Sequence, residues 1–303
     1  MFFLCRRAET DPGYPRYPRL PRPACPGYDP EAMTRLERAG MITAYAVEGA
    51  GPPLLLIHGV GARLDAWDGV VTALGGRFTT IRLDLRGHGE SSKPPGPYSA
   101  ALFAEDARAL LDHLGIGRCH VAGHSLGATV ALRLALDAPD RVERLVLLSA
   151  AAGRTEEERQ RVMERLAIVE HGIPGEHFRR SLPRWFSDEF RRANAALLER
   201  YAARNMENDP RAYAAAYRVL ATTDLADEAA RIRVPTLVVT GEGDIGSNPR
   251  MAWLLHARIP GSRLEILPGL RHAILIEAPA TVAWLLDAFF AGPTAPLPDA
   301  ALD

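Results

Sequence analysis

Val121-Ala122-Gly123-His124-Ser125-Leu126-Gly127 is the stretch that decides the fold of this chain. It has the pattern G-x-S-x-G, follows an apolar run at 119–122 and precedes a helix-like run at 128–138. Glycines permit a sharp strand-to-helix turn, and such a turn lifts a serine hydroxyl clear of a sheet. The N–H of Leu126 would then lie at a helix N-terminus, where it can face a developing oxyanion. The stretch therefore predicts a nucleophile elbow centred on Ser125.

The composition of the 303 residues limits the possible partners. The 36 basic and 37 acidic residues give a net charge of −1, so there is no general attraction to nucleic acid or to an anionic membrane. No apolar run approaches the length of a membrane span. The three cysteines are too few and too scattered for a disulfide framework, and no histidine spacing is typical of zinc sites. We expect a cytoplasmic protein without metal or cofactor, and the sequence does not indicate its oligomeric state.

The first 40 residues differ in composition from the rest of the chain. Seven prolines lie between positions 12 and 30, interleaved with three arginines at 16–22, and they are incompatible with a regular helix or a central strand. One interpretation is a mobile tail, or sequence upstream of a natural start at Met33 or Met41. The other is a proline-rich ligand for a partner domain. We favour a mobile tail over residues 1–40, with a second tail at 294–303.

From residue 41, apolar runs alternate with amphipathic stretches of helical period. The expected strands cover 42–47, 54–57, 79–85, 119–122, 145–149, 236–240 and 263–267. The expected helices cover 67–74, 99–114, 128–138, 251–259 and 279–290. Continuous apolar strands that alternate with helices predict an α/β fold, with a mostly parallel central sheet and helices on both of its faces.

The alternation stops between residues 153 and 224, where the sequence is helical, charged and aromatic. A helical insertion between two strands of one sheet predicts a cap over the catalytic edge. A separate helical domain is the alternative, but the same sheet pattern resumes after the insertion. The predicted organisation is a core of 41–152 and 225–293 and a cap of 153–224.

A serine nucleophile needs a base, and the base needs a group that fixes its tautomer. Asp244 follows the strand expected at 236–240, and His272 follows the strand that ends at residue 267. Both would lie at the carboxyl edge of the sheet, in the known chain order serine, acid, histidine. Glu242 is the rival acid, and we prefer Asp244 because glycines around it let the chain turn.

A second oxyanion donor is expected from the loop after strand 54–57. That loop reads His58-Gly59-Val60-Gly61, and the N–H of Val60 is the candidate donor. The alternative is a tight turn that uses glycine for its conformation only.

With these residues in place, the chain resembles the α/β-hydrolase superfamily over about 41–290. The loop 58–61 matches the superfamily's H-G-x-G, the segment 84–91 matches D-x-R-G-x-G-x-S, and 123–127 matches the elbow. Asp244 and His272 match the acid and the base. The resemblance implies a hydrolase fold with a serine, histidine and aspartate triad.

A finer resemblance links segments 96–99, 110–115 and 184–186 to the 3-oxoadipate enol-lactonase branch, which hydrolyses a small anionic lactone. It implies that Arg184, Trp185 and His124 contact the substrate, with Arg184 the leading candidate to hold a carboxylate. The chain departs from the usual pattern of that branch at Ala128 and at Leu270-Arg271. These departures leave the identity of the substrate undetermined, but they do not change the expected hydrolytic mechanism.

We therefore expect a cofactor-free serine hydrolase that cleaves a small ester or lactone through an acyl-enzyme. A slow-turnover ligand receptor on the same fold is one alternative. A dinucleotide-dependent oxidoreductase is another, since Gly59-Val60-Gly61 follows a strand and Asp84 ends the next one. Leu64 stands where the third glycine of that fingerprint belongs, which argues against the oxidoreductase.

Overall fold

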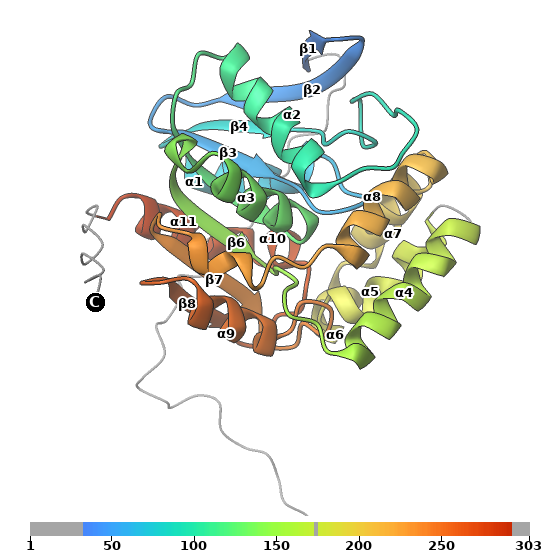
Figure 1. The fold of residues 1–303 in the computed structure, drawn as a ribbon. Helices are drawn as coiled ribbons and strands as arrows, with labels where there is room; N and C mark the ends of the chain where they lie inside the picture. The colour runs from blue at the N-terminus through green and yellow to red at the C-terminus, as the bar shows by residue number, and fades with distance from the viewer. Residues whose placement is uncertain (1–32, 173–174, 293–303) are drawn as a thin grey trace, which may run out of the picture.

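The computed structural model describes residues 33–172 and 175–292. Their centre is an eight-stranded sheet with the order β1-β2-β4-β3-β5-β6-β7-β8 (Figure 1). β1 and β2 pair antiparallel with their neighbours, and all other pairs are parallel. The strands are β1 (Thr34–Arg38), β2 (Met41–Glu48), β3 (Pro53–Ile57), β4 (Thr79–Leu83), β5 (Cys119–His124), β6 (Val142–Leu148), β7 (Thr236–Gly241) and β8 (Arg263–Leu267).

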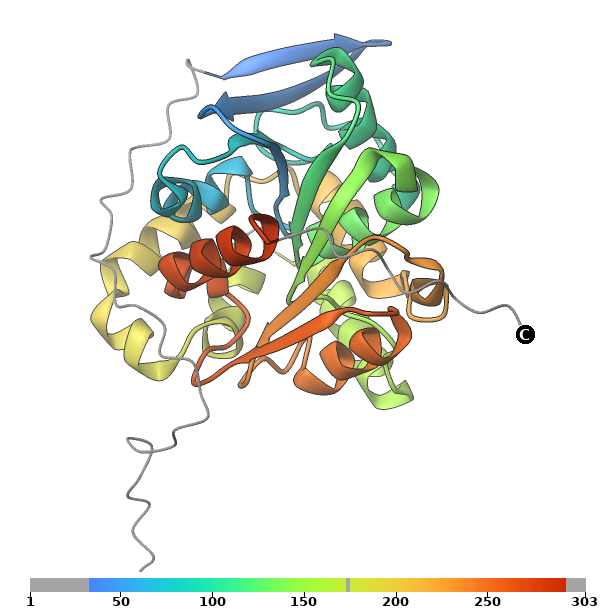
Figure 2. The same ribbon diagram turned by 90° about the vertical axis from the view of Figure 1, so that its left-hand side faces the viewer.

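Helices cover both faces of the sheet. One face carries α1 (Asp68–Leu74), α10 (Ile274–Glu277) and α11 (Pro279–Phe290), and the other carries α2 (Ala100–His113), α3 (Leu126–Asp137) and α9 (Pro249–Arg258). Figure 2 shows α11, in red, and α3, in green, on opposite sides of the sheet. Three short 3-10 helices complete the core, namely η2 (Leu64–Trp67), η3 (Pro139–Arg141) and η4 (Glu228–Arg231). The predicted α/β fold with a mostly parallel sheet is confirmed.

The run in β3 shows why the central strands are apolar throughout. Leu54 and Leu56 pack with the helices of one face, while Leu55 and Ile57 pack with those of the other. All four side chains are fully buried. Successive side chains of a strand point to opposite faces, so a sheet covered on both sides needs an apolar residue at every position. Each such side chain contributes about 1.5–3 kcal/mol to folding.

Five α-helices of the described residues lie between β6 and η4 in the chain, where the strand and helix alternation was expected to stop. They are α4 (Glu156–His171), α5 (Glu176–Trp185), α6 (Asp188–Ala193), α7 (Ala195–Asn205) and α8 (Pro210–Thr222). They gather at one end of the sheet (Figure 1). α4 packs on α8 through a cluster that includes Val162, Leu166, Tyr213 and Tyr217. We refer to these five helices as the helical region.

The expected tail over residues 1–40 differs from the structure at its end. Thr34–Arg38 form β1, which pairs with β2 through a two-residue turn at Ala39 and Gly40. Both turn residues have positive φ, 49° and 74°, as a tight hairpin requires. The turn was missed because alanine is unusual in that conformation. The calls on residues 1–32 and on the tail at 294–303 lie outside the described residues.

Cys119 is a fully buried free thiol in β5. Within the residues that the structure describes, no helix combines the length and the apolar character needed to cross a membrane.

Candidate active site

The residues expected to carry the chemistry each follow a strand at the same edge of the sheet. Val60 comes after β3, Ser125 after β5, Asp244 after β7 and His272 after β8. Because these strands are parallel, their carboxyl ends share one edge, which is where sheets of this type place their sites. Val60, Ser125 and His272 line a single pocket. Asp244 lies behind His272 and bonds to it.

Ser125 occupies a strained turn. Its φ of 55° and ψ of −116° lie outside the regions that a non-glycine residue ordinarily adopts. A Cβ on Gly123 would lie 2.1 Å from the Gly127 carbonyl oxygen, and a Cβ on Gly127 would lie 2.1 Å from that of Ile57. Both positions therefore need glycine for the turn to close. Strain of this kind costs about 1–3 kcal/mol and persists where the surrounding structure enforces it.

Val60 and Leu126, the two candidate oxyanion donors, belong to segments that meet at Ser125. A Cβ on Gly59 would lie 3.2 Å from the Ser125 Cβ, so the loop after β3 passes directly over the serine. Leu126 is the first residue of α3, where N–H groups have no partner inside the helix. The placement fits the two donors expected from the sequence.

His58 fixes the shape of that loop. Its Nδ1 donates to the Gly59 carbonyl oxygen over 2.7 Å, and its Nε2 accepts from the Leu85 N–H over 3.0 Å. These two bonds require the neutral tautomer with the proton on Nδ1. Burial lowers the pKa of His58 to about 4, which keeps the ring neutral at physiological pH.

Asp84 connects two loops from the core of the protein. Its side chain is fully buried, and its two carboxylate oxygens accept from the N–H groups of Leu64 and Glu90 over 2.8 and 2.9 Å. Burial raises the pKa of Asp84. The carboxylate is therefore occupied by backbone donors and is not free to bind a ribose, which removes the observation that favoured an oxidoreductase.

Asp244 and His272 form a direct hydrogen bond. The His272 Nδ1 donates to the Asp244 Oδ2 over 2.7 Å, and the other carboxylate oxygen accepts from the N–H groups of Gly246 and Ser247, each over 2.9 Å. Burial would raise the pKa of Asp244, but His272 and these hydrogen bonds outweigh it and hold the pKa below its usual value. The aspartate is thus a fixed anion behind the imidazole.

Glu242, the rival acid, lies elsewhere. Its side chain is exposed, and its Oε2 accepts from the Gly269 N–H over 3.0 Å. No hydrogen bond or ion pair joins Glu242 to His272 in the part of the chain that the structure describes. The geometry therefore pairs Asp244, and not Glu242, with His272.

His124 and Trp185 flank His272. The His124 Nε2 donates to the His272 carbonyl oxygen over 2.9 Å, and burial lowers the pKa of His124 to about 3. The Trp185 ring stacks near the His272 ring, with centroids 6.2 Å apart. Both residues also line the pocket. His124 thus has a positioning contact that the sequence did not reveal, in addition to its expected place beside the substrate.

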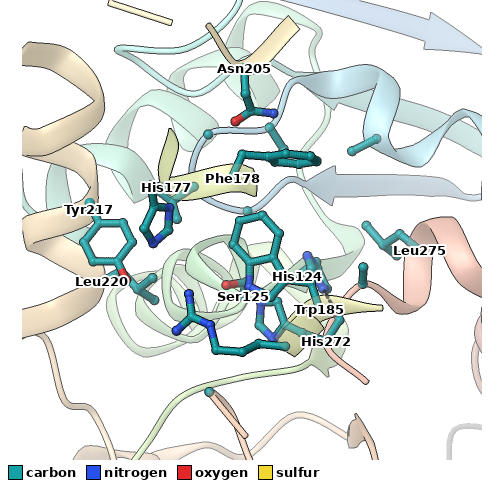
Figure 3. A pocket seen from close by; sticks show the side chains of 18 of the residues that line it. His124, Ser125, His177, Phe178, Trp185, Asn205, Tyr217, Leu220, His272 and Leu275 are labelled. Carbon is teal, nitrogen blue, oxygen red and sulfur yellow. Dashed lines mark hydrogen bonds between the residues drawn. The ribbon is translucent and has the colours of Figure 1, made fainter. Parts of the chain in front are cut away.

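The pocket lies between the sheet edge and the helical region, and its volume is about 150 Å³. Figure 3 shows His124, Ser125 and His272 grouped together, with His177, Tyr217 and Leu220 across from them. Arg184 lines it, as expected from the sequence. Arg154, Arg165 and His177 line it too and were missed. Arg165 falls on the same stripe of α4 as the buried Val162, Leu166 and Val169, which was the available signal.

Other arginines of the helical region lie outside the pocket. Arg179, Arg180 and Arg191 form ion pairs with Glu199, Glu176 and Asp188 on the surface.

Over residues 33–172 and 175–292, no group of three or more histidine, cysteine or carboxylate side chains could hold a metal ion.

Comparison with known proteins identifies similar sequences and structures. The family model described as alpha/beta hydrolase fold matches residues 52–279. A crystal structure of a hydrolase from Pseudomonas aeruginosa is 34% identical and has a TM-score of 0.80, over 87% of this chain and 100% of that chain. The enol-lactonase from Burkholderia xenovorans is 27% identical with a TM-score of 0.80, over 86% and 100% of the two chains. The pimeloyl-[acyl-carrier protein] methyl ester esterase of Nitrosomonas europaea is 30% identical, over 79% of this chain and 96% of its own.

Proposed function

The chain belongs to the α/β-hydrolase family, and from that premise we propose that it is a serine hydrolase that cleaves a small carboxylic ester or lactone. Relatives named as a hydrolase, an enol-lactonase and an esterase support the hydrolase activity. The observation that carries the finer proposal is the strained elbow at Ser125, which lines one pocket with a histidine already bonded to a buried aspartate.

The first half-reaction forms an acyl-enzyme. The Ser125 Oγ attacks the acyl carbon while the His272 Nε2 takes the hydroxyl proton. Asp244 accepts from the His272 Nδ1, so the lone pair of that ring stays on Nε2 and the imidazolium is stabilised as it forms. The N–H groups of Val60 and Leu126 bind the oxyanion, and each such donor is worth roughly 3 kcal/mol of barrier. Collapse of the tetrahedral intermediate expels the alcohol oxygen, which takes the proton from His272.

The second half-reaction returns the free enzyme. Water attacks the acyl carbon as His272 again removes a proton, and the intermediate expels Ser125, which is reprotonated. With a lactone the alcohol and acid products are one molecule. The small volume of the pocket supports a small substrate, because a cavity of about 150 Å³ admits a molecule of the size of benzene.

A substrate screen tests this proposal. The protein is assayed with p-nitrophenyl esters of increasing acyl length and with a panel of small lactones, beside the Ser125→Ala variant. We expect hydrolysis of short-chain substrates and a loss of ~10³-fold or more in the variant. Turnover close to that of the unaltered protein in Ser125→Ala would contradict the mechanism. A lack of turnover on every substrate, with one ligand retained tightly, would favour the receptor alternative.

A further inference from the structure

The pocket carries, beside the helical region, three arginines that form no ion pair with a carboxylate of the described residues. Arg154 precedes α4, Arg165 lies in α4 and Arg184 lies in α5, and all three line the same pocket as Ser125. Within the described residues none of the three forms an ion pair with a carboxylate, and Arg184 donates only to the Ser181 hydroxyl.

The other two arginines that line this pocket, Arg63 and Arg204, do form ion pairs with carboxylates. Arg63 forms an ion pair with Glu207 over 2.7 Å, and Arg204 forms one with Asp65. Two of the five pocket arginines are thus held in ion pairs, whereas Arg154, Arg165 and Arg184 have none among the described residues. A buried charge is costly without a counter-ion, and such a cost is typical of sites that receive one from a ligand.

Arg165 acts on the other two arginines and on His177. Burial lowers the pKa of Arg154, Asp224 opposes this shift, and repulsion from Arg165 adds to it. Burial and then repulsion from Arg165 lower the pKa of Arg184. Burial lowers the pKa of His177 to about 3, and Arg184 and Arg165 add to that shift. All four side chains line one pocket, and Arg165 is near enough to act on each of the other three, with His177 neutral.

His177 provides a second, independent observation. Its side chain is 6% exposed, and its Nδ1 lies 2.9 Å from the Tyr213 hydroxyl. Its Nε2 is buried and has no hydrogen-bond partner among the described residues. When the Tyr213 hydroxyl donates to Nδ1, the proton of the neutral ring lies on Nε2, which is then an unused donor in the pocket wall.

We propose that Arg154, Arg165, Arg184 and His177 form a subsite for a carboxylate carried by the substrate. The inference rests on the proposed hydrolysis at Ser125 and names the class of substrate: a short ester or lactone whose acyl part ends in a carboxylate. Arginine binds a carboxylate through charge-assisted and often bidentate hydrogen bonds. The pocket wall near His272 is apolar at Trp185 and Leu275, which suits the short carbon chain between the two polar ends.

A matched pair of esters tests the subsite. Mono-p-nitrophenyl glutarate and p-nitrophenyl valerate have five-carbon acyl chains that differ in a terminal carboxylate or methyl group. We expect the unaltered protein to prefer the glutarate. In Arg165→Gln and in Arg184→Gln, the ratio of kcat/KM for the anionic ester to that for the neutral ester should fall ~10- to 100-fold, as for the loss of one charged hydrogen bond.

Each variant has a control on its own helix. Arg161 precedes Arg165 by one turn of α4 and pairs with Glu157 at the surface, and Arg180 precedes Arg184 by one turn of α5 and pairs with Glu176. Arg161→Gln and Arg180→Gln remove the same net charge outside the pocket. We expect them to leave the ratio unchanged. An equal fall in the controls would mean that only the overall field of the protein acts, and would overturn the subsite.

A binding measurement separates this inference from the proposed function. In the Ser125→Ala protein, glutarate should raise the Tm while valeramide, a neutral molecule with the same number of carbons, should not, and the additional change Arg165→Gln should abolish the effect. An unchanged ratio of rates in the arginine variants overturns the subsite even if both esters are cleaved. If the unaltered protein cleaves no ester or lactone, the proposed function fails, and the glutarate effect on Tm still decides whether the carboxylate subsite exists.

Discussion

Replacing Asp244 by asparagine should lower turnover by ~10⁴-fold without disturbing the fold. The side-chain oxygen that accepts from the N–H groups of Gly246 and Ser247 can only be replaced by the amide oxygen. The amide NH₂ must then face the His272 Nδ1, where a carboxylate oxygen accepts a proton over 2.7 Å in the native protein. Two donors cannot bond to each other, so the imidazole proton moves to Nε2. Nε2 then has no lone pair to take the proton of Ser125, because the lone pair of the ring lies on Nδ1.

The expected loss corresponds to about 5.4 kcal/mol of transition-state stabilisation, at 1.36 kcal/mol per tenfold. Initial rates on the best p-nitrophenyl ester of the screen give kcat and KM for the native protein, Asp244→Asn and Glu242→Gln. Glu242→Gln is the matched control, because Glu242 is an exposed acid two residues away that bonds only to the Gly269 N–H in the described structure. The reasoning is refuted if Glu242→Gln causes the large loss, or if Asp244→Asn lowers kcat less than tenfold.

Two further predictions concern stability. Gly127→Ala should destabilise the fold by at least about 1–3 kcal/mol, because the added Cβ would lie 2.1 Å from the Ile57 carbonyl oxygen. Gly117→Ala is the control and should be neutral, because there is open space around Gly117. Urea unfolding of both variants measures the difference, and equal midpoints would count against the elbow geometry. Acid should destabilise the protein, since burial lowers the pKa of His58 to about 4 and those of His88 and His177 to about 3. In the unfolded chain these histidines have a pKa of 6.5, so below that pH the unfolded chain binds protons that the folded protein does not. Each histidine should therefore lower the free energy of unfolding by about 1.4 kcal/mol per pH unit as the pH falls from 6.5 towards 4. A free energy of unfolding that stays constant from pH 7.5 to 5 would contradict the burial of these rings.

Local patterns predicted the fold and indicated the candidate site residues, because each pattern depends on a few neighbouring positions. Two glycines around Ser125 are needed for the turn, and the continuous apolar run in β3 is needed for a sheet covered on both faces. Asp244 was preferred to Glu242 because of the glycines around it, and in the structure it is Asp244 that bonds to His272, while Glu242 bonds to the Gly269 N–H. The membership of the α/β-hydrolase family, expected from the motifs, is confirmed.

Features that depend on distant contacts were not accessible from the sequence. β1 was missed because its side chains are mostly exposed and because Ala39 adopts a positive φ where glycine or asparagine is usual. The arginines at the far end of the pocket come from separate helices, so only the packing of α4 on α5 and α8 brings Arg165 near Arg184 and His177. The position of Arg165 on the apolar face of α4 can be recognised from the sequence. The residues that surround Arg165 in the pocket cannot be predicted in this way.

The nucleophilic role of Ser125 is the central claim, and covalent labelling tests it most directly. The protein is treated with a p-nitrophenyl organophosphonate, its intact mass is measured, and the modified peptide is mapped by fragmentation. The account predicts one adduct per chain, located at Ser125, with complete loss of ester hydrolysis, and no adduct in Ser125→Ala. An adduct at another residue, or full hydrolytic activity in a protein labelled at Ser125, would contradict it.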